Sequence, residues 1–77
     1  MGKNIIVRFE EGGIVRCFPV SVNPGTTAAQ ILSQRGLKGY LIQNAVTGFI
    51  YPLRGDLFPL IKDGDVAETI HETMVEL

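Results

Sequence analysis

Apolar residues recur at every second position from Ile5 to Phe9. In the stretch NIIVRFE, Ile5, Val7 and Phe9 fall on one side of an extended backbone, and Ile6 and Arg8 fall on the other. A period of two residues is typical of a strand with one buried face. The pattern therefore predicts a strand at the start of the chain.

A second strand is predicted directly after the pair Gly12-Gly13. β-Branched and aromatic residues resume at once in IVRCFPVSV, and two glycines can take the positive φ angles of a tight hairpin turn. Pro19 cannot donate a backbone hydrogen bond, so this strand is expected at an edge of the sheet or bulged near that residue. Its apolar face carries Ile14, Phe18, Val20 and Val22.

The segment NPGTTAAQILSQRGL carries the signals of a short helix. Thr27 and Gln30 have the spacing of a capping box, and Gly36 offers the left-handed conformation that commonly ends a helix. A helix of about two to three turns is too short to be stable alone, so its apolar side must pack on the hairpin. The apolar positions at helical spacing are Ala28, Ile31 and Leu32.

The second half of the chain predicts shorter elements. The run YLIQNAVTGFIYPL indicates two short strands joined at Thr47-Gly48, and Pro52 limits the second of them. The loop RGDLFPLIKDGD is too apolar to remain in water, so we expect it to cover the open end of the core. Its large apolar residues are Leu57, Phe58, Leu60 and Ile61.

The closing stretch VAETIHETMVEL has the composition of a strand. Its register is ambiguous because apolar residues occur on both faces, and a bulge would be needed to reconcile the two faces. One face carries Val66, Ile70 and Met74, and the other carries Ala67, Thr69, His71 and Val75. The simplest sheet places this strand in the middle, parallel to the first, because the helix lies in the crossover between them. We therefore expect a single α+β domain over residues 1–77.

The composition excludes several classes of protein. A chain of 77 residues with 45% hydrophobic and 19% charged residues is too apolar to be disordered. A formal net charge of -1, with the basic residues scattered, argues against a nucleic-acid partner. The single Cys17 excludes an internal disulfide and is expected to be a small buried residue. Without a membrane-spanning run or a signal peptide, the chain is expected to be cytoplasmic and free of membranes.

No group of residues has a pattern typical of catalysis. His71 and Cys17 lack neighbours that would complete a triad or a metal site, so we expect no enzyme, no cofactor and no metal. Asp63 and Asp65 lack the further oxygen ligands of a calcium loop. The tripeptide RGD at 54–56 is interpreted as a turn, because a three-residue match is weak support for an adhesion motif.

Three stretches resemble the ubiquitin-like β-grasp superfamily. VNPGTTAAQIL is similar to the ubiquitin segment in which a proline-containing turn leads into a Thr-capped helix, and YLIQNAVTG is similar to its third strand and turn. LIKDGDVAETI resembles the start of the last strand, also in sulfur-carrier proteins and TGS domains. The resemblance covers Asn4 to Val75. It implies a mixed sheet of four to five strands in the order ββαβββ, with one short helix on one face.

The end of the chain bears on what this resemblance implies about function. Ubiquitin-like modifiers and sulfur carriers act through a C-terminal Gly-Gly, because only a tail without side chains threads an activating enzyme, whereas this sequence ends MVEL. We therefore expect a non-catalytic protein-interaction module or small accessory subunit. The alternatives are a degenerate modifier or sulfur carrier that needs an activating enzyme, and a TGS-like accessory domain of an RNA or nucleotide system.

The expected binding surface is the open face of the sheet. The runs FIYPL and LFPLI hold more apolar side chains than one small core needs, and exposed apolar patches often mark partner surfaces. Ile6 and one of Leu41 or Ile42 are expected to point outward. Ubiquitin binds most partners through an aliphatic residue on its third strand, and the best match to it is Ile42. We expect Ile6, Tyr40 and Ile42 to contact a protein partner, with Arg8 or Lys62 at the polar rim. The alternative is that the apolar residues complete the core. The chain is expected to be a monomer or a weak oligomer.

Overall fold

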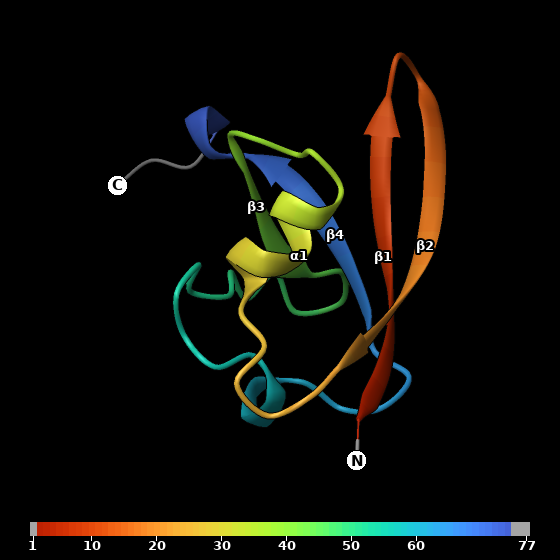
Figure 1. Ribbon diagram of the computed structural model, residues 1–77. Coiled ribbons are helices and arrows are strands. Elements are labelled where there is room, and N and C mark those ends of the chain that lie inside the picture. The colour runs from red at the N-terminus through yellow and green to blue at the C-terminus, as the bar shows by residue number, and fades with distance from the viewer. Residues whose placement is uncertain (1, 75–77) are drawn as a thin grey trace.

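The computed structural model describes residues 2–74, which form a four-stranded mixed sheet with one helix packed on one face (Figure 1). The strands are β1 (Lys3–Glu11), β2 (Ile14–Val22), β3 (Tyr40–Asn44) and β4 (Val66–His71). Their spatial order is β2-β1-β4-β3, with β4 parallel to β1 and antiparallel to β3. The prediction that the last strand lies beside the first and parallel to it is confirmed.

The β1–β2 hairpin turns at Gly12 and Gly13, whose φ angles are 58° and 82°. Its antiparallel pairing runs without a bulge from Glu11 opposite Ile14 to Lys3 opposite Val22. β4 follows β1 only along Ile6–Arg8, so the tip of the hairpin extends past the rest of the sheet (Figure 1). The predicted hairpin is therefore confirmed, and β2 is an edge strand.

Helix α1 (Ala28–Gln34) is held at both ends by the signals expected from the sequence. The Thr27 hydroxyl accepts a hydrogen bond from the Gln30 amide at 3.2 Å, and the Gln30 side chain accepts one from the Thr27 amide at 3.1 Å. At the other end Gly36 has a φ of 68°, and the Leu37 amide donates to the Leu32 carbonyl at 2.9 Å. These bonds satisfy backbone groups that a helix of this length otherwise leaves unpaired.

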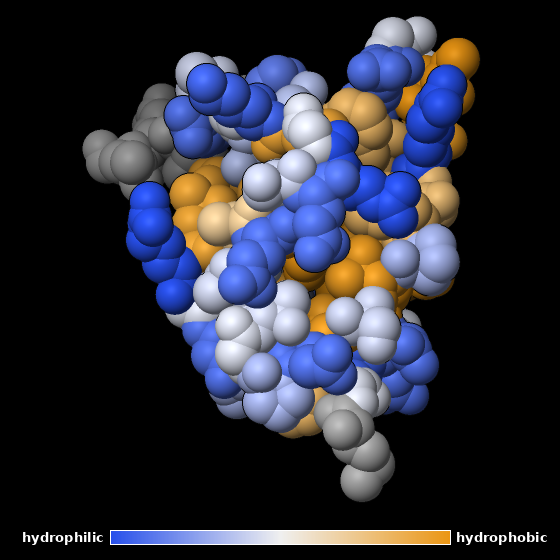
Figure 2. Space-filling view, in the orientation of Figure 1, coloured by the Kyte–Doolittle hydropathy of each residue, from blue (hydrophilic) through white to orange (hydrophobic). Residues whose placement is uncertain are grey.

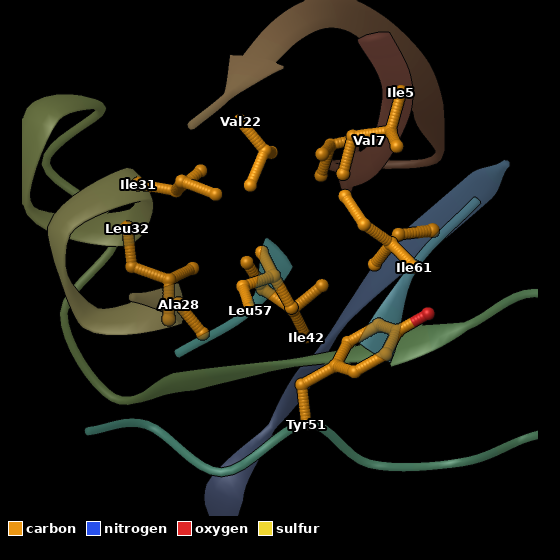
Figure 3. Packing of buried hydrophobic residues seen from close by; sticks show 11 residues of the cluster. Ile5, Val7, Val22, Ala28, Ile31, Leu32, Ile42, Tyr51, Leu57 and Ile61 are labelled. Carbon is orange, nitrogen blue, oxygen red and sulfur yellow. The ribbon is translucent and has the colours of Figure 1, made fainter. Parts of the chain in front are cut away.

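The hydrophobic core lies between α1, the covered face of the sheet and the loop before β4 (Figure 3). Leu57 and Ile61 of that loop are buried, which confirms that the loop covers the open end of the core. Phe58 packs against the core from its partly buried position, whereas Leu60 is exposed. The buried residues are Ile5, Val7, Val22, Ala28, Ile31, Leu32, Ile42, Tyr51, Leu57, Ile61 and Ala67.

Polar contacts fix the same loop to the sheet and to the start of the helix. The Lys3 ammonium donates to the Phe58 carbonyl at 2.8 Å and to the Ile61 carbonyl at 3.0 Å, at the ends of the 3-10 helix Phe58–Leu60. The Asp56 carboxylate accepts hydrogen bonds from the backbone amides of Gly25 at 2.9 Å and Phe58 at 3.1 Å. The aspartate of the RGD tripeptide therefore has a structural role in the turn.

Several expectations about the strands are wrong in detail. The second of the two short strands after β3 is reduced to one bridge, between Gln43 and Ile50. β4 ends at His71, where a 3-10 helix (Glu72–Met74) begins, so it is shorter than the sequence suggested. Of the two faces that the sequence left open for β4, the one with Ala67 and Thr69 is turned toward the core, and Ala67 is buried there. Val75, assigned to that face, lies outside the described residues.

Two residues of β2 are more exposed than expected. Cys17 was expected to be buried, but it pairs with Arg8 on the uncovered side of the sheet and is exposed. Ile14 is 59% exposed although it belongs to the predicted apolar face. The reason is the length of the hairpin, because α1 and β4 do not reach the tip where Ile14 lies.

Candidate functional site

The face of the sheet away from α1, called the open face below, carries apolar pairs at neighbouring strand positions. Ile6 lies opposite Pro19 on one side and Val66 on the other. Leu41 lies opposite Ile70 on the neighbouring strands β3 and β4. Ile6 and Val66 remain 39% and 37% exposed. The prediction that Ile6 points outward is confirmed.

A row of polar side chains crosses the open face between these apolar pairs. Cys17, Arg8, Glu68 and Gln43 lie opposite one another on the four adjacent strands. The Glu68 carboxylate accepts from the Arg8 guanidinium at 2.8 Å and from the Gln43 side-chain amide at 2.6 Å. An exposed ion pair adds little stability. The row therefore mainly orients polar groups between the pair formed by Ile6 and Val66 and the pair formed by Leu41 and Ile70.

Two of the residues expected to bind a partner lie on the opposite side of the sheet. Ile42 was expected to point outward, but it is fully buried opposite Thr69, and Leu41 is the outward residue of β3. Tyr40 shares the covered face with Ile42 and is half-buried. Its ring centroid lies 4.3 Å from that of His71 and 5.4 Å from that of Phe9. Both assignments to the open face are wrong, because β3 has the other of its two possible orientations.

Beside the open face lies a hollow of about 560 Å³ with several exposed apolar residues on its walls. Val66 belongs both to the open face and to this hollow, and Lys62, expected at a polar rim, lies on its wall. We use the name apolar strip for the exposed residues that run from the open face into the hollow, namely Ile6, Val66, Val46, Phe49 and Leu60.

Most of the apolar strip was missed by reasoning from the sequence. Val46 and Phe49 are 89% and 51% exposed, and neither was assigned to a binding surface. The signal that could have found two of these residues is the apolar surplus in FIYPL and LFPLI, which contain Phe49 and Leu60. The fold buries some of these apolar residues and exposes others, because Tyr51, Leu57 and Ile61 from the same runs lie in the core.

The acidic residues before β4 serve the backbone. The Asp63 carboxylate accepts from the Asn4 amide at 2.7 Å, and the Asp65 carboxylate accepts from the Lys62 amide at 2.8 Å. These bonds support the interpretation of KDGD as a plain turn. Within residues 2–74, no three His, Cys, Asp or Glu side chains are grouped to hold a metal ion.

Comparison with known proteins adds no family. A scan against protein-family models gives no match, and neither does a search of curated proteins. None of the helices formed by residues 2–74 is long and apolar enough to cross a membrane. The geometry of the open face and the apolar strip is therefore the basis for inferring a function.

Proposed function

We propose that this chain is a non-catalytic ubiquitin-like β-grasp domain that binds a protein partner through the apolar strip. The contacts come from the open face at Ile6 and Val66 and from the adjoining hollow. Arg8, Glu68 and Lys62 form the polar rim, as is usual around an apolar interface centre. The domain acts as an interaction module or as a small accessory subunit of a larger protein.

The observation that carries this proposal is the exposure of large apolar side chains around one hollow. Val46, Phe49, Leu60 and Val66 together line its walls and remain open to solvent. Scattered exposed apolar residues are normal on a protein surface, whereas a contiguous group more often marks a contact with another molecule. The two runs that supply Phe49 and Leu60 also fill the core, so their exposed members are a surplus over what folding requires.

The β-grasp part of the proposal rests on the order of the elements and on the sequence resemblance. That fold is compatible with the observed order of a hairpin, a helix and a last strand in the middle of the sheet, parallel to β1. The outward aliphatic residue on β3 is Leu41, next to Ile70. Leu41 therefore takes the outward position on β3 that was expected of Ile42, outside the apolar strip.

The proposal is tested with the variant Val46→Glu, which places a charge in the apolar strip at a position that is 89% exposed. The matched control is Ile14→Glu, at the hairpin tip, which is 59% exposed and lies outside the strip. Proteins retained from cell extract by the immobilised chain are compared by quantitative mass spectrometry. We expect a defined partner to be lost with Val46→Glu and kept with Ile14→Glu. Equal retention by both variants would contradict the assignment.

A further inference from the structure

The free edge of β2 is the part of the sheet that the proposed function leaves unused. β2 is the last strand on its side, and its residues 14–17 are all exposed. The opposite edge is different, because the Tyr51 amide donates to the Ile42 carbonyl at 3.0 Å and the Asn44 amide donates to the Phe49 carbonyl at 2.8 Å. In the described part of the sheet, β2 is therefore the strand with an uncovered edge along its whole length.

The backbone groups at this edge can be assigned from the register. The Ile6 amide donates to the Asp65 carbonyl at 3.0 Å, toward β4, so the backbone groups of Ile6 point away from β2. Opposite residues of an antiparallel pair either exchange both hydrogen bonds or neither. The backbone groups of Pro19, which lies opposite Ile6, therefore point outward from the sheet. The same holds at every second residue of β2, and so for Cys17 and Val15. Pro19 removes one donor from the edge, and the amides of Val15 and Cys17 stay available.

We propose that two copies of this chain associate through their β2 edges, as an antiparallel pair with Cys17 opposite Cys17 of the second copy. An unpaired strand edge is a template for another strand, and proteins usually blunt it with charges or prolines. Here only Pro19 and Arg16 oppose pairing, whereas Ile14 and Val15 add exposed apolar surface. Figure 2 shows apolar surface interrupted by hydrophilic residues along the hairpin, at the right of the view.

The sequence of β2 selects this register over its neighbours. With Cys17 at the two-fold axis, Arg16 lies opposite the second copy's Phe18, and Val15 lies opposite its Pro19. A shift that centres Arg16 would place two guanidinium groups opposite each other, which is destabilising. In the chosen register, the Cys17 amide donates to the opposite Cys17 carbonyl and the Val15 amide to the opposite Pro19 carbonyl.

The arrangement ends at a dimer. The two copies use the same strand, β2, so the contact is closed by a two-fold axis. Helix α1 makes its main strand contacts with β3, on the far side of the sheet from β2, so the helices leave the edge accessible. The apolar strip takes no part in this contact. A failure of the dimer would therefore leave the proposed partner binding unaffected, and the reverse also holds.

The first experiment measures mass in solution under reducing conditions. Sedimentation equilibrium over a concentration series is expected to show the weight-average mass of the unmodified chain rising from 8.4 kDa toward twice that value. Cys17→Lys and Cys17→Glu each place like charges opposite one another, so each is expected to lose this increase. An equimolar mixture of the two variants pairs opposite charges and is expected to regain it.

The exposed position of Cys17 makes both variants compatible with folding, and circular dichroism verifies it. Should Cys17→Lys fail to fold, Cys17→Glu, which lies opposite Arg8, carries the test. A chain that keeps a mass of 8.4 kDa at every concentration would overturn the proposal. So would an increase in mass that survives both substitutions, because the contact would then lie elsewhere.

The register is tested by chemical trapping with diamide, which takes up the protons and electrons released when two thiols join as a disulfide. Opposite residues in a hydrogen-bonded pair have Cα atoms about 5.5 Å apart, within the range that a disulfide spans. The unmodified chain is therefore expected to form a covalent dimer. In the control Val15→Cys/Cys17→Ser, the thiols lie about 13 Å apart along the strands, and trapping is expected to be lost. Equal trapping of both proteins would overturn the register.

Discussion

The orientation of β3 makes a sharp prediction about two adjacent aliphatic residues. Ile42 is fully buried in the core, and Leu41 is partly exposed on the open face. Ile42→Ala removes three carbons, for a lost transfer free energy of about 2.4 kcal/mol at ~0.8 kcal/mol per methylene. The cavity left behind raises the loss of unfolding free energy to about 3–4 kcal/mol. Leu41→Ala, the matched control, is expected to lose about 1 kcal/mol.

This loss is large for so small a protein. A chain of 77 residues has a total unfolding free energy of about 4–12 kcal/mol, so Ile42→Ala removes a large share of it. The melting temperature is expected to fall by about 12 °C or more. Urea unfolding followed by far-ultraviolet circular dichroism measures both variants, since the chain has no tryptophan. A larger loss for Leu41→Ala than for Ile42→Ala would refute the orientation of β3.

Three further predictions follow from the loop, the helix and the proposed function. Lys3→Met removes two hydrogen bonds from a charged donor to loop carbonyls and is expected to lower the unfolding free energy by about 2 kcal/mol. Urea unfolding measures this change, and an unchanged midpoint would contradict the role of Lys3. Gly36→Ala forces a φ of 68° on a residue with a side chain, although no atom lies within 4 Å of the new carbon. It is expected to lower the unfolding free energy by about 1 kcal/mol in the same assay, and a gain in stability would contradict this reasoning. The intact mass of the chain after incubation with cell extract and ATP is expected to be unchanged, and an adduct would favour the modifier or carrier alternative.

The local elements could be predicted because their signals lie within a few residues of one another. The glycine pair at the hairpin turn and the capping box of Thr27 and Gln30 each form the hydrogen bonds or backbone angles that their residue types favour. The central position of β4 also followed from the sequence, because parallel neighbours need a crossover and the helix lies in the connection between β1 and β4. The hairpin turn and the helix cap depend little on how the rest of the chain packs.

The orientation of β3 and the extent of the apolar strip could not be predicted in the same way. Leu41 and Ile42 are both aliphatic and adjacent, so no periodic pattern distinguishes the inward residue from the outward one. The orientation of β3 is set by its pairing with β4, which places Ile42 opposite Thr69, and this pairing is long-range. Likewise, Phe49 is exposed and Tyr51 is buried although both flank the bridge between Ile50 and Gln43, so alternation along the chain does not distinguish them and only the folded arrangement does.

The proposed partner binding is tested most directly by site-specific photocrosslinking in cells. A photoreactive phenylalanine analogue replaces Phe49 in the apolar strip, and in a separate protein it replaces Ile14 at the hairpin tip, which is similarly exposed. Irradiation is expected to join the Phe49 protein to one defined partner protein, whereas the Ile14 protein is expected to join only a second copy of the chain. The absence of a defined product at Phe49, or the same product from both positions, would contradict the proposal that the apolar strip binds a protein.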